Sequence, residues 1–189
     1  ESDSHEAWID IMKKAPMSLE SWHLPLRGKI ETLIASSVKK AESLTSSGAA
    51  FIPMTVTPNA DMPDELRSWY LDSRLGGVLQ HQTRSHMRSD LHRYLFAACF
   101  AKLQHYAPTL HNFPPKLLPA HVNIGAEKIP FPDRFRVQIG HVPSSTVVAH
   151  IQKDGHYYIH PDPTQCRSLT VREAARLQTF PDNYFFEGN

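Results

Sequence analysis

The sequence predicts an α+β fold, with a helical N-terminal portion followed by a small antiparallel β-sheet and a short C-terminal helix. Two observations support this prediction. Up to about residue 106, apolar residues recur at the spacing of amphipathic helices. Between residues 134 and 160, apolar and polar residues alternate instead, which is the pattern of strands that bury one face.

Length and composition are those of a globular chain with a core of its own. The 189 residues are 41% hydrophobic and carry a formal net charge of +1, so any basic surface must be a local patch. The two cysteines, Cys99 and Cys166, lie in unrelated contexts, which favours a reducing cytoplasm over a disulfide framework. No apolar run approaches the length of a transmembrane helix, and we therefore expect no membrane partner.

Four helices are predicted in the N-terminal portion. The first, second and fourth carry an apolar stripe at helical spacing, and the third is placed by a proline at its start and two glycines after its end. The helices are expected around residues 8–15, 30–41, 63–74 and 91–106. Trp69 and Tyr70 of the third helix could pack in the core or face nucleic acid, and we expect them to pack in the core. Residues 51–60 suit an edge strand or an extended connection, and residues 107–132 suit a long packed connection.

A cluster of basic residues precedes the fourth helix, in the stretch Q-H-Q-T-R-S-H-M-R-S-D. Arg84 and Arg88 lie at or just before the helix N-terminus, where backbone amides and the helix dipole favour anions. This arrangement suits a phosphate clamp. It equally suits an ordinary ion pair with Asp90 or another acidic neighbour, and the sequence does not decide between the two.

Three antiparallel strands are predicted next, at residues 134–139, 146–152 and 156–160. In the first strand Phe135 alternates with Arg134 and Arg136, so one face is apolar and the other is basic. The second and third strands flank Lys153-Asp154-Gly155, a sequence typical of a tight hairpin turn with Lys153 at its tip. A basic strand face is often simply solvated. Beside it, however, Ser144 and Ser145 leave room for a phosphate to approach.

A short helix is predicted near the C-terminus. Thr170 and Glu173 have the spacing of a capping box, and the helix should run from Val171 to about Gln178 and stop before Pro181. About eight residues do not hold a helix in water, so its apolar residues must pack against something larger. Arg172 and Arg176 lie four residues apart on one face, where they need carboxylates or phosphates as partners.

The whole string C-R-S-L-T-V-R-E-A-A-R-L-Q-T-F-P-D-N-Y-F-F-E-G-N, residues 166–189, closely resembles motif IX of DNA cytosine-5 methyltransferases. That motif reads R-x-L-T-x-R-E-A-A-R-L-Q-x-F-P-D, followed by an aromatic residue, a phenylalanine and a glycine. The resemblance implies a structural role, in which the helix ties the preceding region to the N-terminal catalytic domain of the same protein. The motif IX residues on which we place this role are Arg167, Thr170, Arg172, Glu173, Arg176, Gln178 and Pro181.

A second resemblance to this family lies ahead of motif IX. In these enzymes the target recognition domain carries a threonine followed by an aliphatic residue, and Thr146-Val147 occupies that position here. The resemblance implies that residues 1–165 form the target recognition region and that residues 166–189 form motif IX, cut before motif X. The implied partner is double-stranded DNA. Together with the basic residues above, the candidate DNA contacts are Arg84, Arg88, Arg134, Arg136, Ser144, Ser145, Thr146, Val147 and Lys153.

The catalytic strings of the family do not occur in this sequence. They are the P-C-Q loop with its cysteine nucleophile, the E-N-V and Q-x-R-x-R strings, and the F-x-G-x-G turn that receives S-adenosylmethionine. We therefore expect this cofactor to act in a full-length, bacterial-type enzyme and not to be bound by this chain, an inactive fragment with no catalytic residue. No metal site is expected, because neither C-x-x-C nor H-E-x-x-H occurs.

Two other functions stay open at this point. The chain could be a self-standing DNA-binding module, which sequence-specific binding by the chain alone would support. It could also be a structural or interaction domain, which a complete absence of salt-dependent DNA binding would favour.

Overall fold

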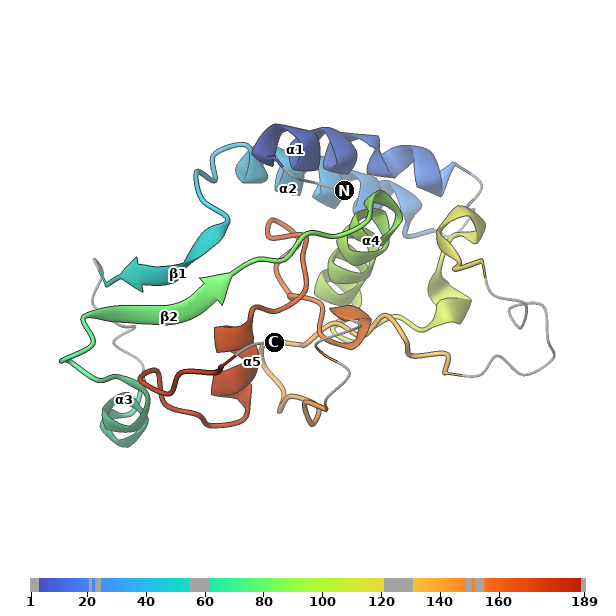
Figure 1. The fold of residues 1–189 in the computed structure, drawn as a ribbon. Coiled ribbons are helices and arrows are strands. Elements are labelled where there is room, and N and C mark those ends of the chain that lie inside the picture. The colour runs from blue at the N-terminus through green and yellow to red at the C-terminus, as the bar shows by residue number, and fades with distance from the viewer. Residues whose placement is uncertain are drawn as a thin grey trace. The chain divides into compact units, whose positions relative to one another are not determined.

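A computed structural model describes residues 4–20, 22, 25–54, 62–120, 131–148, 151 and 155–187. These residues form five α-helices and a two-stranded antiparallel sheet, which confirms the α+β class (Figure 1). The chain divides into two compact units. The first contains Glu1–Thr45, Ser85–Ser145 and Ala149–Ser168, and the second contains Ser46–Arg84, Thr146–Val148 and Leu169–Asn189.

The first unit is built on three helices. They are α1 (His5–Lys14), α2 (Arg27–Ala41) and α4 (Arg88–Gln104), and each packs against the other two. A 3-10 turn, η1 (Ala15–Leu19), follows α1, and two others, η2 (Leu110–Asn112) and η3 (Pro115–Leu117), follow α4. Together these elements enclose the hydrophobic core of the unit.

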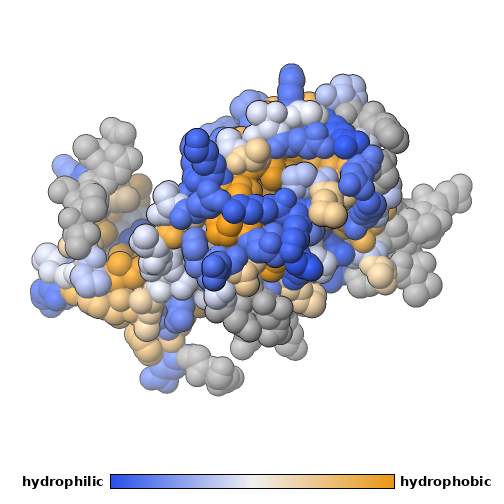
Figure 2. Space-filling view, turned by 90° about the horizontal axis from the view of Figure 1, so that it is seen from above, coloured by the Kyte–Doolittle hydropathy of each residue, from blue (hydrophilic) through white to orange (hydrophobic). Residues whose placement is uncertain are grey.

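The centre of α4 is buried on all sides, because Y-L-F-A-A-C-F-A leaves no polar face from residue 94 to 101. A single apolar stripe was therefore too narrow a prediction for this helix. Phe96 lies in the middle of the core, with ring centroids 5.3 Å from Trp22 and 4.9 Å from Phe113. The outer surface over α1 and α2 is mostly hydrophilic, with hydrophobic residues visible between the polar side chains (Figure 2).

His92 joins α4 to the first helix and the turn after it. Its Nε2 lies 2.9 Å from the Ile11 carbonyl oxygen, and its Nδ1 lies 3.3 Å from the Ser18 hydroxyl. Because a carbonyl oxygen only accepts, Nε2 carries the proton in the neutral ring. Burial lowers the pKa of His92 from its ordinary value near 6.5, and the charges of Arg88 and Arg93 act in the same direction.

The lowered pKa makes the stability of this unit depend on pH. His92 takes up a proton more readily in the unfolded chain than in the folded chain. Its contribution to the stability of the folded unit is therefore present above about pH 6.5 and is lost as the pH falls below that value. We expect the urea midpoint of the wild type to drop between about pH 7.5 and pH 5.5. His92→Gln should reduce that drop, whereas the exposed control His111→Gln should retain it. Equal pH dependence in all three proteins would contradict the assignment.

The second unit contains the sheet. Strands β1 (Gly48–Pro53) and β2 (Gly77–Gln82) pair antiparallel, with Gly48 opposite Gln82 and Pro53 opposite Gly77. Gly48 has a φ of 83°, and a Cβ built there would lie 1.9 Å from the His81 carbonyl oxygen, so the strand requires glycine at this position. The short helix α5 (Val171–Leu177) packs against β2.

The position of the sheet corrects the sequence prediction. β1 overlaps the extended segment expected at 51–60, of which residues 55–60 lie outside the described residues, whereas β2 was not anticipated. The three strands expected between 134 and 160 do not form a sheet in the described residues. There, Val137 and Ile159 form an isolated parallel bridge, Ile159 bridges Ser168, and Gly155–Tyr157 is a 3-10 turn, η5. Parallel pairing of these segments is incompatible with the expected chain of antiparallel hairpins.

Helix boundaries and exposure also differ from expectation. The third helix, α3 (Asp64–Tyr70), is shorter than predicted, and Pro63 is its N-cap rather than its first residue. Trp69 is 57% exposed and not part of the core, while Tyr70 is half-buried. The fourth helix ends at Gln104, because His105 adopts a left-handed conformation with φ of 62° that terminates α4.

Candidate functional site

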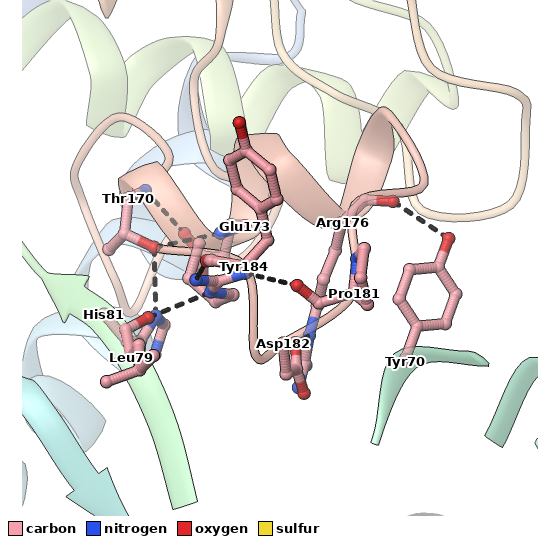
Figure 3. A network of polar contacts seen from close by, with 10 residues as sticks. Tyr70, Leu79, His81, Thr170, Glu173, Arg176, Pro181, Asp182 and Tyr184 are labelled. Carbon is pink, nitrogen blue, oxygen red and sulfur yellow. Dashed lines mark hydrogen bonds and ion pairs between the residues drawn. The ribbon is translucent and has the colours of Figure 1, made fainter. Parts of the chain in front are cut away.

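Helix α5 begins with the predicted capping box (Figure 3). The Thr170 hydroxyl accepts a hydrogen bond from the Glu173 backbone N–H at 3.2 Å, and the Glu173 carboxylate accepts one from the Thr170 N–H at 2.8 Å. The same hydroxyl lies 2.9 Å from His81 Nδ1 on β2. The N-terminus of the helix is thus joined to the sheet of its own unit, and a strand that sequence reasoning missed supplies the partner.

Arg172 is the most buried charged side chain of this helix, with 1% of its surface exposed. Its guanidinium donates hydrogen bonds to the carbonyl oxygens of Leu79, Pro181 and Tyr184, at 3.0, 2.9 and 2.5 Å. It also lies over the Phe186 ring, 5.8 Å from the centroid. Burial lowers the pKa of Arg172. Fixed carbonyl dipoles therefore take the place of the carboxylate or phosphate that the sequence led us to expect.

Arg176 meets the carboxylate that was expected. Its Nε and Nη2 donate to the two carboxylate oxygens of Asp182 at 2.8 and 2.6 Å, and Asp182 is 1% exposed. These hydrogen bonds to Asp182 raise the pKa of Arg176. Tyr70 connects the pair to the end of α3, because its hydroxyl donates to the Arg176 carbonyl oxygen at 3.0 Å and its own carbonyl accepts from the Asp182 N–H at 2.9 Å. Figure 3 shows these side chains beside α5.

The chain after α5 folds back through an aromatic cluster. The rings of Phe180, Tyr184 and Phe186 lie with centroids 4.8 to 5.2 Å apart. Gln80 on β2 pairs with the backbone of Phe186 in both directions, through hydrogen bonds of 2.6 and 2.8 Å. Gln80 has a φ of 55°, unusual for a residue other than glycine, so the tertiary contact holds a backbone conformation that its sequence does not favour.

Not every motif IX residue lies in this network. Arg167 belongs to the first unit, where it is buried and donates to the Ser168 carbonyl oxygen at 3.0 Å and to the Gln165 side chain at 3.1 Å. Val171 and Leu177 are exposed on α5, although we expected the apolar residues of this helix to be packed. In the described residues, the buried side of the helix is formed by Arg172, Ala174 and Ala175.

The candidate DNA contacts of the first unit differ in their surroundings. Arg88 is in the first turn of α4, with its side chain 58% exposed and 3.7 Å from Asp10. Asp90, the partner we had weighed for Arg84 or Arg88, instead pairs with Arg93 at 2.8 Å. The Arg136 side chain pairs with Asp133. Arg134 is half-buried.

Gln138 organises the loop that carries the candidate serines. Gln138 alternates with the apolar residues of the predicted 134–139 strand, as Arg134 and Arg136 do, but it is buried. Its Nε2 donates to the Tyr157 carbonyl oxygen at 2.7 Å and to the Ser145 hydroxyl at 3.2 Å. Ser145 is thereby held at the base of the loop, while residues 140–144, including Ser144, are exposed. A buried amide thus closes a loop whose tip faces solvent.

Three of the remaining candidates, Thr146, Val147 and Arg84, belong to the second unit. Thr146 is exposed and Val147 is half-buried, and the Val147 carbonyl oxygen accepts a hydrogen bond of 2.5 Å from Gln178 Nε2. Arg84 lies two residues beyond β2 and is half-buried. Lys153 and Asp154, from the hairpin turn expected at residues 153–155, lie outside the described residues, whereas Gly155 begins η5.

Most of the chain matches one known protein family. The sequence profile of the family described as C-5 cytosine-specific DNA methylase matches residues 62–189, which include α3, β2, α4, the 131–148 segment and α5. The chain belongs to this family. The match covers Thr146-Val147 and the network around α5, whereas α1, α2 and β1 precede it.

Three bacterial methyltransferases are similar in sequence to part of this chain. The type II methyltransferase M.Bpa9945I of Bacillus paralicheniformis is 60% identical over 78 residues, which are 41% of this chain and 17% of the relative. The putative type II methyltransferase M.OihORF3336P of Oceanobacillus iheyensis is 42% identical over 57 residues, 30% of this chain and 12% of the relative. The type II methyltransferase M.AgeI of Thalassovita gelatinovora is 44% identical over 59 residues, which are 31% of this chain and 13% of the relative. The matches thus span less than a fifth of each relative's length, and no solved structure matches the chain.

The chemistry available to the described residues is limited. Both thiols, Cys99 and Cys166, are buried, and burial raises the pKa of each well above its ordinary value, so neither is a ready nucleophile. Within the described ranges, no cluster of three or more His, Cys, Asp or Glu side chains is placed to hold a metal ion. No helix in that part of the chain is both long and apolar enough to cross a membrane.

Proposed function

We propose that this chain is the DNA-recognition part of a DNA (cytosine-5)-methyltransferase. The observation that carries the proposal is the family match over residues 62–189, which includes both the motif IX string and Thr146-Val147. The full-length protein would transfer a methyl group from S-adenosylmethionine to carbon 5 of cytosine in a specific sequence of double-stranded DNA. Residues 1–165 would form the target recognition region and residues 166–189 motif IX.

The proposed roles divide by chemistry. Arginine side chains contact phosphates, which supplies affinity without sequence preference, and the small side chains at residues 144–147 read base edges. Cytosine carbon 5 is out of reach inside a duplex, so the full enzyme must extrude the base, and this part would form one wall of the cleft that receives the DNA.

Cofactor and nucleophile are assigned to the rest of the protein. The chain has no F-x-G-x-G turn for S-adenosylmethionine, and its two thiols are buried with raised pKa values, so the residues present do not fit that chemistry. The proposed partner is therefore the N-terminal catalytic domain of the same protein. We propose that the chain alone is inactive and that motif IX joins the two parts.

Complementation tests the proposal. We expect the chain, mixed with a separately expressed N-terminal part that carries the cofactor and cysteine motifs, to restore transfer of tritiated methyl groups to unmethylated DNA, while neither part is active alone. Thr146→Ala combined with Val147→Ala should lower the rate roughly tenfold or more, because base contacts of this kind contribute about 1–3 kcal/mol. The control is Ser36→Ala, an exposed hydroxyl on α2 that bonds only within its helix among the contacts described.

Two results would contradict the proposal. If the chain methylates DNA without the second part, it is not a recognition fragment. If the two parts associate and the double variant methylates DNA at the wild-type rate, the DNA contact is not at Thr146-Val147 and must be sought at the basic residues Arg134 and Arg136.

A further inference from the structure

Within the second unit, Gln178 connects the end of α5 to the segment Thr146–Val148. Gln178 is the C-cap residue of α5, with its backbone N–H bonded to the Ala174 and Ala175 carbonyl oxygens at 3.3 and 3.0 Å. Its side-chain Nε2 donates to the Val147 carbonyl oxygen at 2.5 Å. Residues 31 positions apart in sequence are thereby held together.

The helix that carries Gln178 is held in place by contacts at both of its ends. A helix as short as α5 does not persist in water by itself, but here Arg172 bonds to the β2 carbonyl of Leu79 and Thr170 contacts His81. At the other end, Arg176 is paired with the buried Asp182. The position of Gln178 is therefore set by β2 and by the chain after α5, and not by the segment that it holds.

We infer that Gln178 is a positioning residue for DNA recognition, because its amide fixes the backbone of Val147 and so presents the exposed Thr146 side chain in one orientation. The inference rests on the proposed function, since it assumes that Thr146 and Val147 contact DNA. Fixing a recognition segment before binding lowers the conformational cost of binding, and it favours the sequence that fits the fixed arrangement. Phosphate contacts made elsewhere do not depend on this bond.

The variant that tests the bond is Gln178→Met, which keeps the side-chain length and removes the donor. Gln178→Glu keeps the shape but also adds a negative charge. Gln82→Met and Gln82→Glu are matched controls, because Gln82 is an exposed glutamine in the same unit and the same charge change occurs there. The positive reference is the double variant Thr146→Ala, Val147→Ala.

Two measurements are made, the first on the 189-residue chain and the second on the chain reassembled with the separately expressed N-terminal part, in the wild type and in each variant. The first is hydrogen exchange of the peptide covering residues 143–148, which we expect to be roughly three- to tenfold faster in both Gln178 variants at an unchanged melting temperature, as for loss of one hydrogen bond. The second is the ratio of affinities for a duplex that the wild type selects from a randomised library and for a scrambled duplex. This ratio should fall by a similar factor in Gln178→Met, while affinity for the scrambled duplex stays the same.

The outcomes separate the two proposals. If the double variant loses discrimination but Gln178→Met keeps it, or if exchange of residues 143–148 is unchanged in Gln178→Met, the positioning role is refuted and the proposed function stands. If the wild type does not discriminate between duplexes, or if the double variant discriminates as well as the wild type, the DNA contact assigned to Thr146-Val147 is wrong and the role of Gln178 falls with it.

Discussion

Replacing Arg172 with methionine is expected to lower the free energy of unfolding of the second unit by about 3–5 kcal/mol. Three carbonyl oxygens, those of Leu79, Pro181 and Tyr184, lose their shared donor, and a side chain of similar length replaces the guanidinium without bonding to any of them. Each unpaired buried acceptor costs about 1–3 kcal/mol, and these costs are not fully additive. Arg172→Lys should also destabilise the unit, because a single ammonium group lacks the planar fork that reaches separate carbonyls.

Hydrogen exchange across a urea series measures this loss where it occurs, in peptides that cover β2 and α5. The control is Arg74→Met in the same unit, because the Arg74 side chain is 86% exposed and pairs only with Asp72 among the contacts described. This control should exchange as the wild type does. If Arg172→Met has wild-type protection at β2 and α5, the buried guanidinium does not hold the two elements together.

The second large effect is expected in the first unit, where Phe96→Ala should cost about 3–5 kcal/mol. Phe96 is buried in the middle of α4 and its ring contacts those of Trp22, Phe100 and Phe113. Removing the ring leaves a cavity that the surrounding helices fill only in part. Phe96→Leu should cost less, since it retains most of the buried volume.

Urea unfolding followed by tryptophan fluorescence measures this change, because Trp22 lies next to the substituted ring. Phe185→Ala is the matched control. Phe185 is an exposed phenylalanine, and its loss should change the free energy of unfolding by no more than about 0.5 kcal/mol. Equal losses in Phe96→Ala and Phe185→Ala would show that the packing around α4 does not determine the stability of the first unit.

Local features could be predicted from the sequence because the interactions that produce them are short in sequence. The capping box joins Thr170 to a residue three positions away, and the helix that it starts ends, as expected, before Pro181. The α+β class and the helices α1, α2 and α4 follow in the same way from apolar spacing. The spacing of Arg172 and Arg176 also showed that both need partners.

The identity of those partners was decided by the tertiary structure. The Leu79 carbonyl that binds Arg172 is 93 positions away in sequence, on a strand that sequence analysis did not predict. The contact of Gln178 with Val147 likewise joins two segments, and the sequence pattern of neither segment predicts that they meet.

The region from 134 to 160 shows the same limit most clearly. Alternation correctly indicated that Phe135 and Val137 are buried, because burial of one face is what alternation records. Alternation did not determine which segments pair. Backbone N–H and C=O groups can pair whatever the side chains, and the segment that lies alongside decides whether the pairing is parallel or antiparallel. By itself, the sequence therefore determined the helices α1, α2, α4 and α5, the capping box of α5 and the charges that needed partners. Only the tertiary structure decided which strands pair and which carbonyls surround Arg172, because those contacts depend on segments brought together by packing of the whole unit.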